Sequence, residues 1–531
     1  LRLLAALMAC CMLCACSSKE EAPAETTTPS PAQSTEATVQ PTGTIVYGIT
    51  NSWGSLNPYH VVNYSGFTVH DKLWESLYSV DESGNLINRS CESYEVEEEG
   101  KVFVIHLRQD IKWSDGEPVT AQDWEFAARM VADPAVTGMA GKTYPACLIG
   151  VDANGNRDES EDFGLIAVDD YTLKFILDDP YNYGQFWLNN YRFYHPLPQH
   201  VMKDIAPADF ATSTFWLEPV TCGPWKFVST TPGEEVVMVA NENFYYPVKT
   251  QNLIIRKVAA SSLASSLISG DVNVTSQVQL EDLGALRADG NVTVYKADQT
   301  EYVYCHINNA ICNKQVRKAI NLAIDKQQIC DTVFNGEAIP AACSLNPNSP
   351  FFGVELSTER DVEAAKKLIT ESGWDTKTVI KMATPADYRE KIALIMQQNL
   401  AEIGVKLELT SCDQTAMQAG LKDGTYKMGM QAWGMHYQAP TYFQICQRPG
   451  SSINLSFIDY NDYINYTKAI DSCQDEKELY NLVQEYITYM GEDVGHIALC
   501  HKNMYSGWSA KVTNGPTALA HDLSWDWAIS E

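Results

Sequence analysis

The histidines and cysteines of this chain are not spaced as in a familiar catalytic or metal-binding motif. His195 and His200 are five residues apart, as are His496 and His501, so neither pair shares one face of a helix. The chain has no GxSxG or HExxH motif, and the cysteines beyond residue 16 contain no CxxC pair. A pair of glycosidase carboxylates stays open among the 67 acidic residues, because sequence alone does not show which acids meet.

The acidic stretch DANGNRDESED, residues 152–162, has the alternating acids and amides of a calcium loop. Two positions exclude an EF-hand, because Arg157 replaces the required Gly and Phe163 replaces the required Glu. A solvated acidic loop is therefore predicted. His436 stands alone and the cysteines lack metal spacing, so we expect neither a resident metal nor a cofactor.

The charge balance limits the partners of the chain. Its 531 residues include 67 acids and 38 Lys or Arg, which gives a formal net charge of -29 at pH 7. This charge repels phosphate and anionic lipid headgroups, so nucleic-acid binding and a polybasic membrane contact are disfavoured. The length suffices for roughly two to four lobes of about 100 to 200 residues each.

Residues 1–16 have the layout of a signal peptide, with Arg2, an apolar run and Ala15 before Cys16. This end resembles a bacterial lipobox, and the resemblance implies that Cys16 is diacylated and becomes a lipid anchor. Residues 17–43 are rich in Thr, Pro, Ala and Glu and are predicted to form a disordered tether. No later stretch has about 18 consecutive apolar residues, so no transmembrane helix is expected.

Beyond residue 43 the pattern alternates between strands and helices. The clearest unit is 379–411, in which VIKMAT is a strand, a helix with apolar residues at helical spacing ends at Gly404, and VKLELT is a second strand. Such a βαβ unit requires a parallel sheet. The other predicted strands are 44–50, 101–110, 170–177 and 234–241, and the other predicted helices are 121–134, two short ones in 316–336, and 363–374. The pattern predicts two α/β regions with a β-rich insertion between them.

Several stretches together resemble the family 5 extracellular solute-binding proteins, the peptide- and nickel-binding receptors of ABC importers. The most specific is residues 90–134, which contains WSDGEPVTAQD. Shorter stretches match in the same order, namely SLNPY (55–59), LWESLY (73–78), VDDYTLKFIL (168–177), PLPQHV (196–201), TCGPWKFV (221–228) and GVKLEL (404–409). The resemblance extends from Thr44 to the C-terminus.

The resemblance implies an α/β clamshell of the periplasmic-binding-protein type, with a third lobe inserted in the first and a hinge between lobes I and III. The implied boundaries are 44–77, 197–298 and 497–531 for lobe I, 78–196 for lobe II and 299–496 for lobe III. The implied molecule is a monomer without catalytic activity on the outer face of the cytoplasmic membrane. It would close on a peptide or other small organic solute and deliver it to ABC permease subunits.

The stretch QAWGMHYQAP, residues 431–440, departs from the peptide-binding members of that family. In those members an Asp that pairs with the α-ammonium of the peptide stands at the position of His436. A buried ammonium needs a counter-charge, and a histidine with an ordinary pKa of about 6.5 is mostly neutral at pH 7. With Trp433 and Tyr437 beside it, we predict a ligand without a free amino group here, such as a blocked or cyclic peptide, an oligosaccharide or another polar organic nutrient. A bound metal chelate also stays open. An ordinary peptide whose ammonium meets a different acid remains the alternative.

The resemblance places further ligand contacts elsewhere in the chain. Ser52 and Trp53 align with the strip that holds the ligand main chain, although Trp53 is equally compatible with the lobe I core. Tyr302 and Tyr304, at the passage into lobe III, line the cleft or pack the hinge. Tyr144, after the first helix of lobe II, is the last candidate.

Two other functions stay open from the residues alone. One is a secreted glycoside or peptide hydrolase on an α/β scaffold, and the other is a surface receptor for signalling peptides. A hydrolase would consume the compound that stabilises it, whereas a binding protein would not. Neighbouring genes for permeases and ATPases would favour transport over signalling.

Overall fold

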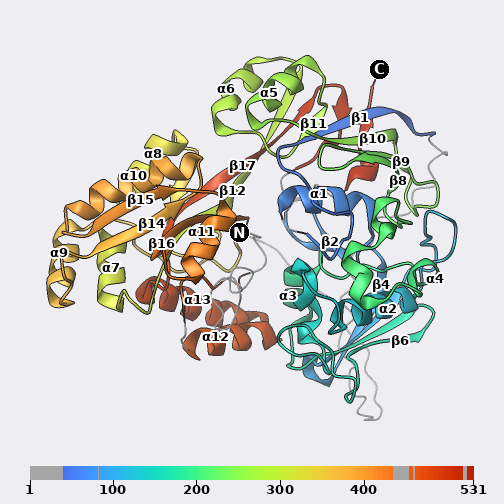
Figure 1. The fold of residues 1–531 in the computed structure, drawn as a ribbon, viewed down its shortest axis with the longest axis horizontal. Helices are drawn as coiled ribbons and strands as arrows, with labels where there is room; N and C mark the ends of the chain where they lie inside the picture. The colour runs from blue at the N-terminus through green and yellow to red at the C-terminus, as the bar shows by residue number, and fades with distance from the viewer. Residues whose placement is uncertain are drawn as a thin grey trace, which may run out of the picture.

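The computed structural model describes residues 40–61, 63–81, 83–434, 440, 454–458, 461–517 and 523–530. Within them the molecule is mixed α/β, as the sequence predicts, and consists of two bodies joined by two long strands (Figure 1). These strands are β12 (Val292–Ile307) and β17 (Ile497–Ser509). The expected signal peptide, most of the tether, Cys16, His436 and Tyr437 lie outside the described residues.

Lobe I is built on the parallel pair β1 (Thr42–Ile49) and β10 (Thr250–Lys257). β10 continues antiparallel into the next two strands, so this part of the sheet reads β11-β1-β10-β9-β8. The remaining elements are β8 (Trp225–Thr231), β9 (Glu235–Ala240), β11 (Val274–Thr275), β18 (Val512–Thr513), β19 (Ala528–Ile529), α1 (Tyr64–Leu73), α5 (Ala260–Ser269), α6 (Leu283–Ala288) and the 3-10 turns η3 (Pro207–Thr212), η4 (Thr214–Leu217), η5 (Leu280–Asp282) and η7 (Ser524–Asp526).

Lobe II carries the β-rich insertion as a four-stranded antiparallel sheet in the order β4-β5-β7-β6. Its main helix, α2 (Ala121–Ala132), begins where the Thr120 N–H donates to the Asp123 carboxylate over 2.9 Å and ends before Pro134. The other elements are β2 (Tyr78–Val80), β3 (Leu86–Asn88), β4 (Cys91–Glu97), β5 (Val102–Leu107), β6 (Leu165–Asp169), β7 (Thr172–Ile176), α3 (Tyr183–Asn190), η1 (Glu98–Gly100) and η2 (Ala140–Cys147). The short helix α4 (Gln199–Met202) follows where the chain returns to lobe I.

Lobe III contains the predicted βαβ unit. β14 (Val379–Thr384) and β15 (Lys406–Ser411) pair in parallel, and α10 (Tyr388–Ala401) connects them. The apolar residues that predicted α10 are buried, namely Ile392, Ile395, Met396, Leu400 and Ile403. Gly404 follows with a φ of +80°, the left-handed conformation in which a glycine avoids strain. The other elements are β13 (Ala338–Pro340), β16 (Met428–Gly434), α7 (Lys314–Ala323), α8 (Lys326–Phe334), α9 (Val362–Glu371), α11 (Gln414–Lys422), α12 (Asn461–Ser472) and α13 (Glu476–Asp493).

Strands β12 and β17 carry one sheet across both bodies. Residues 292–297 of β12 pair with 504–509 of β17 next to lobe I, whereas residues 301–305 pair with 497–502 next to lobe III. The register shifts between Ala297 and Glu301, which marks a local bend in the ladder. The pairing shows that β17 crosses from lobe III to lobe I near Lys502. The resemblance implies a boundary between these lobes at residue 496, a few residues earlier.

The hydrophobic interior follows the same division into two bodies. Ile45 in lobe I and Trp113 and Trp187 in lobe II belong to one connected set of buried side chains. Lobe III has separate clusters, one around Met382 and Met396 and another that includes Ile470 of α12 and Tyr486 of α13. Because burial is the main favourable term in folding, the shared core joins lobes I and II into one packed unit, and the cores of lobe III are separate from it. The cysteines in the described part of the chain are free thiols.

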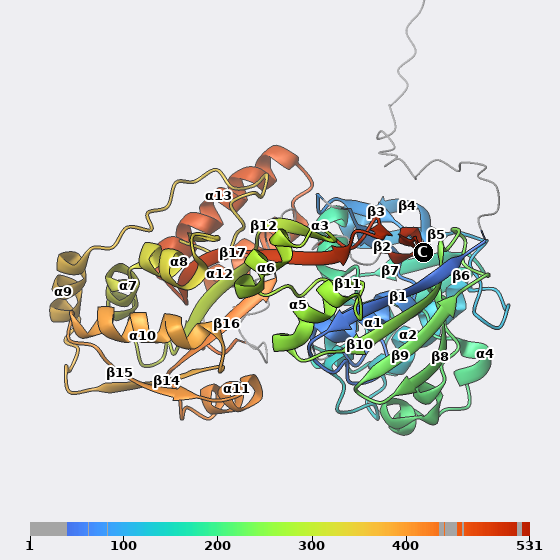
Figure 2. The ribbon, with the colours of Figure 1, turned by 90° about the horizontal axis from the view of Figure 1, so that it is seen from above.

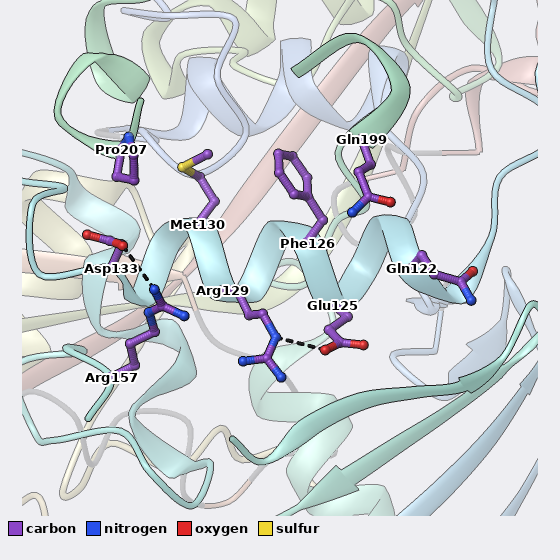
Figure 3. Close-up of a pocket in the computed structure, with 9 residues that line it drawn as sticks. All are labelled: Gln122, Glu125, Phe126, Arg129, Met130, Asp133, Arg157, Gln199 and Pro207. Carbon is purple, nitrogen blue, oxygen red and sulfur yellow. Dashed lines mark hydrogen bonds and ion pairs between the residues drawn. The ribbon is translucent and has the colours of Figure 1, made fainter. Parts of the chain in front are cut away.

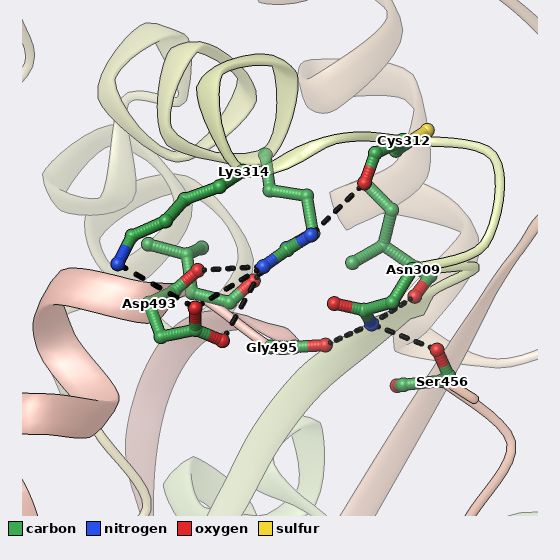
Figure 4. A network of polar contacts seen from close by, with 9 residues as sticks. Asn309, Cys312, Lys314, Ser456, Asp493 and Gly495 are labelled. Atoms are coloured by element: carbon green, nitrogen blue, oxygen red, sulfur yellow. Dashed lines mark hydrogen bonds and ion pairs between the residues drawn. The ribbon is translucent and has the colours of Figure 1, made fainter. Parts of the chain in front are cut away.

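A buried ion pair fixes the first helix of lobe III. Arg317 in α7 is 2% exposed and its guanidinium lies 3.3 Å from the carboxylate of Asp493, at the end of α13. It also donates to the carbonyls of Val494 and Cys312, at 2.9 and 3.0 Å. Lys314 approaches the same carboxylate from the surface, at 3.6 Å (Figure 4). The network ties the start of α7 to the end of α13, just before β17 begins.

Replacing Arg317 by Leu should lower the free energy of unfolding by roughly 3 kcal/mol, because the Asp493 carboxylate then stays buried without its main counter-charge. The control, Lys314→Ala, removes a half-exposed cation beside the same carboxylate and should cost less than about 1 kcal/mol. Urea unfolding measures both changes. Equal losses in the two variants would contradict this role of Arg317.

Candidate functional site

Strand directions decide which edges of the two bodies face each other. β17 runs from lobe III into lobe I, and β11 is antiparallel to it, so β11 and its parallel neighbour β1 run toward lobe III. β12 runs the opposite way, and β16 is antiparallel to it, so β16 runs toward lobe I. In Figure 2 the C-terminal end of β1 points at the other body. The carboxyl ends of β1 and β16 are therefore opposed, and ligands of open α/β sheets bind at such ends.

The lobe I side of this site is the segment that follows β1. Gln277 holds its first residue, because its side-chain oxygen accepts from the N–H and the hydroxyl of Thr50 at 2.8 and 2.6 Å. The Ser52 carbonyl accepts from the side chain of Asn63 at 2.8 Å, and Ser52 itself stays partly exposed. Trp53 is 2% exposed and belongs to the lobe I core. Of the two predicted residues, only Ser52 offers surface to a ligand in this conformation.

The lobe III side is formed by the end of β16. Trp433 pairs in the ladder with Tyr302 and is partly exposed. Tyr302 and Tyr304 have no exposed surface and stack on each other at 5.2 Å between ring centroids, with 8° between the ring planes. Tyr302 also bonds His496 through its hydroxyl at 2.6 Å. These two tyrosines are buried where the strands cross between the bodies, and Trp433 packs against them.

A half-buried aromatic cluster in lobes I and II was not predicted. Tyr144 stacks on Phe193, with 4.1 Å between centroids and 20° between planes, and Phe193 lies 6.4 Å from Phe67. The guanidinium of Arg192 lies 5.2 Å from the Phe67 ring and 3.6 Å from the Asp71 carboxylate. Only Tyr144 was a candidate from sequence. The stretch YRFYH, which puts an arginine between aromatic residues of an acidic chain, was the available signal.

His195 and His200 are bonded to groups of the protein itself. His195 lies within hydrogen-bond distance of the Glu75 and Arg192 carbonyls, at 2.8 and 2.9 Å, and His200 pairs with Asp115 at 2.8 Å. No group of three His, Cys, Asp or Glu within the described ranges could hold a metal ion.

In the acidic loop at 152–162, the Asp152 carboxylate accepts hydrogen bonds from the backbone and side chain of Asn156, so its oxygens are bonded within the loop.

Three histidines are buried behind Trp433. His306 bonds Ser456 at 2.9 Å and Gln431 at 3.1 Å, and His501 bonds the Cys343 carbonyl at 3.1 Å. Burial lowers the pKa of His306 and of His501 to about 4, and that of His496 to about 3. All three are neutral at pH 7, whereas the buried amine of Lys326, which donates to the Ala341 carbonyl at 2.8 Å, has a pKa that burial lowers to about 8 and so keeps most of its positive charge.

A shallow recess elsewhere does not compete for the role of ligand site. It has a volume of about 310 Å³ and lies along α2 (Figure 3). Its lining residues are Gln122, Glu125, Phe126, Arg129, Met130, Asp133, Arg157, Gln199 and Pro207. Arg129 pairs with Glu125 at 2.7 Å and Arg157 with Asp133 at 3.3 Å, so its charges satisfy each other. None of the predicted ligand residues lines it.

The buried histidines make stability depend on pH. In the folded protein His306 stays neutral down to about pH 4, whereas in the unfolded chain it takes up a proton below about pH 6.5. Its contribution to the free energy of unfolding is therefore complete above about pH 6.5 and declines as the pH falls toward about 4. Between pH 7 and pH 5 the wild type should lose roughly 2 kcal/mol more unfolding free energy than His306→Gln. Urea unfolding at the two pH values measures this difference. An identical pH dependence in the wild type and His306→Gln would refute it, and His200→Gln at a partly exposed site is the control.

Comparisons with known proteins agree with this geometry. Residues 85–451 match the middle region of the bacterial extracellular solute-binding proteins, family 5. The periplasmic oligopeptide-binding protein of Escherichia coli (strain K12) is 26% identical over 428 residues, which cover 75% of this chain and 76% of that protein.

Solved structures show the same fold. The oligopeptide-binding protein of Bacillus subtilis in complex with a nonapeptide has a TM-score of 0.78 at 20% identity and covers 93% of this chain and 100% of its own. A binding protein from A. tumefaciens R10 in complex with agropinic acid has a TM-score of 0.78 at 18% identity, covering 92% of this chain and 99% of its own. No helix among the described residues is long and apolar enough to cross a membrane. The chain belongs to the bacterial extracellular solute-binding proteins of family 5.

Proposed function

We propose that this protein captures a peptide-like or other small organic solute between its two bodies and delivers it to the permease of an ABC importer. The observation that carries the proposal is the opposition of the carboxyl ends of β1 and β16 across the two connecting strands. A ligand held there contacts both bodies and stabilises their closed arrangement. The related proteins bind an oligopeptide and agropinic acid, which differ widely in chemistry.

The described surroundings favour a ligand that is uncharged at the lobe III end. Trp433 offers a partly exposed ring, and the histidines behind it are neutral at pH 7. We therefore keep the hypothesis that His436 and Tyr437 meet a blocked or cyclic peptide, an oligosaccharide or another polar nutrient without an ammonium group. Ser52, Tyr144 and Trp433 are the proposed contacts with accessible surface.

The cellular arrangement is part of the same proposal. Cys16 would carry the lipid, residues 17–43 would let the bodies stand away from the outer face of the cytoplasmic membrane, and one copy would act alone. Lobe II would comprise 78–196 and lobe III 299–496, with β17 passing between bodies near Lys502. Catalysis is not part of the role, because the relatives are binding proteins.

The first test is a ligand screen by melting temperature on the body without residues 1–43. Di- to pentapeptides, their N-acetylated forms and oligosaccharides are compared, and a ligand at a hundred times its Kd adds about 2.7 kcal/mol to stability. The proposal expects stabilisation by a compound that is recovered unchanged. Steady consumption of the stabilising compound would instead establish a hydrolase.

Trp433→Ala should weaken the best ligand about threefold to tenfold, because a stacked ring contributes roughly 0.5 to 1.5 kcal/mol. Trp433→Phe keeps a ring and should retain most of the affinity. Isothermal titration measures both. An unchanged Kd in Trp433→Ala would exclude this ring from the site.

The charge hypothesis predicts that acetylated peptides bind more tightly than the same peptides with a free amino group. His436→Asp should reverse this order, since a carboxylate stabilises a buried ammonium. His436→Asn is the uncharged control and should leave the order as it is. Tight binding of free-amine peptides by both the wild type and His436→Ala would overturn the hypothesis.

A further inference from the structure

The two bodies touch a second time, away from their connecting strands. The N–H of Asn182, just before α3 in lobe II, donates to the carbonyl of Asp471 in α12 of lobe III. The side-chain amide of the same Asn182 donates to the carbonyl of Cys473 at 2.8 Å. In Figure 1 the end of α12 meets the start of α3 on the side of the molecule opposite α5 and α6.

Two further contacts flank the asparagine. Lys468 in α12 and Asp179 in the lobe II loop form an ion pair at 2.6 Å. The side chain of Gln474 donates to the carbonyl of Tyr181 at 3.1 Å. Gly100 makes room for this contact, because a Cβ there would lie 2.3 Å from the Tyr181 oxygen and 2.9 Å from the Gln474 side-chain nitrogen.

The contact joins two helix ends of opposite polarity. The last four carbonyls of a helix have no partner within it, and Asp471 is among those of α12. Asn182 is the N-cap of α3, where its side-chain oxygen accepts from the Gln185 N–H at 3.1 Å. One residue thus caps α3 with its oxygen and the end of α12 with its nitrogen. The partial charges of the two helix ends attract each other in this arrangement.

Each side of the contact is fixed to its own lobe. In lobe II, the N–H groups of Leu177 and Tyr181 donate to the carbonyls of Lys101 and Gly100, at 2.8 and 2.9 Å. In lobe III, Asp475 caps α13 by accepting from the Glu478 N–H at 2.8 Å. Because neither loop has to fold when the bodies meet, little entropy is lost on contact.

We propose that these residues form a latch that holds the two bodies together without ligand. The latch consists of Asp179, Tyr181 and Asn182 in lobe II and Lys468, Asp471, Cys473 and Gln474 in lobe III. Water can satisfy the same groups when the bodies separate, so the latch is reversible and its net contribution modest. The latch does not include any of the proposed ligand contacts. It therefore raises the apparent affinity for every ligand by the same factor, because it increases the population of the closed form that binds them. This inference rests on the proposed capture function.

Asn182→Asp tests the latch most selectively. The carboxylate still caps α3, but the substitution removes the side-chain donor to Cys473 and places negative charge against that carbonyl oxygen. The ligand-free variant should have a larger radius of gyration in small-angle scattering and faster hydrogen exchange in residues 178–182. Every ligand found in the screen should bind about threefold to tenfold more weakly, with unchanged ranking. The control Asn154→Asp makes the same charge change in the exposed acidic loop.

A charge exchange gives a second test that does not depend on folding around Asn182. Lys468→Asp alone should open the ligand-free protein, and adding Asp179→Lys should restore the closed dimensions at low salt but less at high salt. Unchanged dimensions and exchange rates in both Asn182→Asp and Lys468→Asp would overturn the latch. If the variants open while no ligand binds the wild type, the latch stands and the capture function fails.

Discussion

The antiparallel pairing of β12 with β17 is the constraint on which the rest of the molecule depends. These strands run in opposite directions between the bodies, and their neighbours take their directions from them, so the carboxyl ends of β1 and β16 must be opposed. The shift of register after Ala297 interrupts the β12–β17 ladder at the point where the strands cross from one body to the other. Two strands with an irregular ladder connect the bodies without forming a common core, which permits bending while preserving the opposition of the two edges.

Neither side of the proposed site presents an unmatched acid among the described residues named here. A chain with a net charge of -29 would be expected to offer acids at any surface, yet the described groups behind Trp433 are tyrosines, neutral histidines and the buried amine of Lys326. On the other body, Arg192 is matched by Asp71 and covered by aromatic rings. The rings of Trp433 and Phe67 therefore offer a ligand between them apolar area, and the buried cation of Lys326 disfavours a second positive charge at the lobe III end.

Local patterns could be predicted from the sequence, whereas long-range ones could not. The βαβ unit around α10 follows from helical spacing of its apolar residues and from Gly404, both of which are local signals. The sixteen residues of β12 include β-branched and aromatic residues, but local pattern does not show that they form one strand between the bodies, because that role depends on pairing with residues about two hundred positions away. Trp53, Tyr302 and Tyr304 show a further limit: aromatic side chains suit a core and a binding surface equally, and only burial separates the two roles.

The account stands on a ligand that bridges the two bodies at the opposed strand ends. A crystal structure with the tightest compound from the screen tests this most directly. The account predicts a closed molecule in which the compound contacts both the segment after β1, around Ser52, and the ring of Trp433. A compound bound within one body alone, for example in the recess along α2, would contradict it.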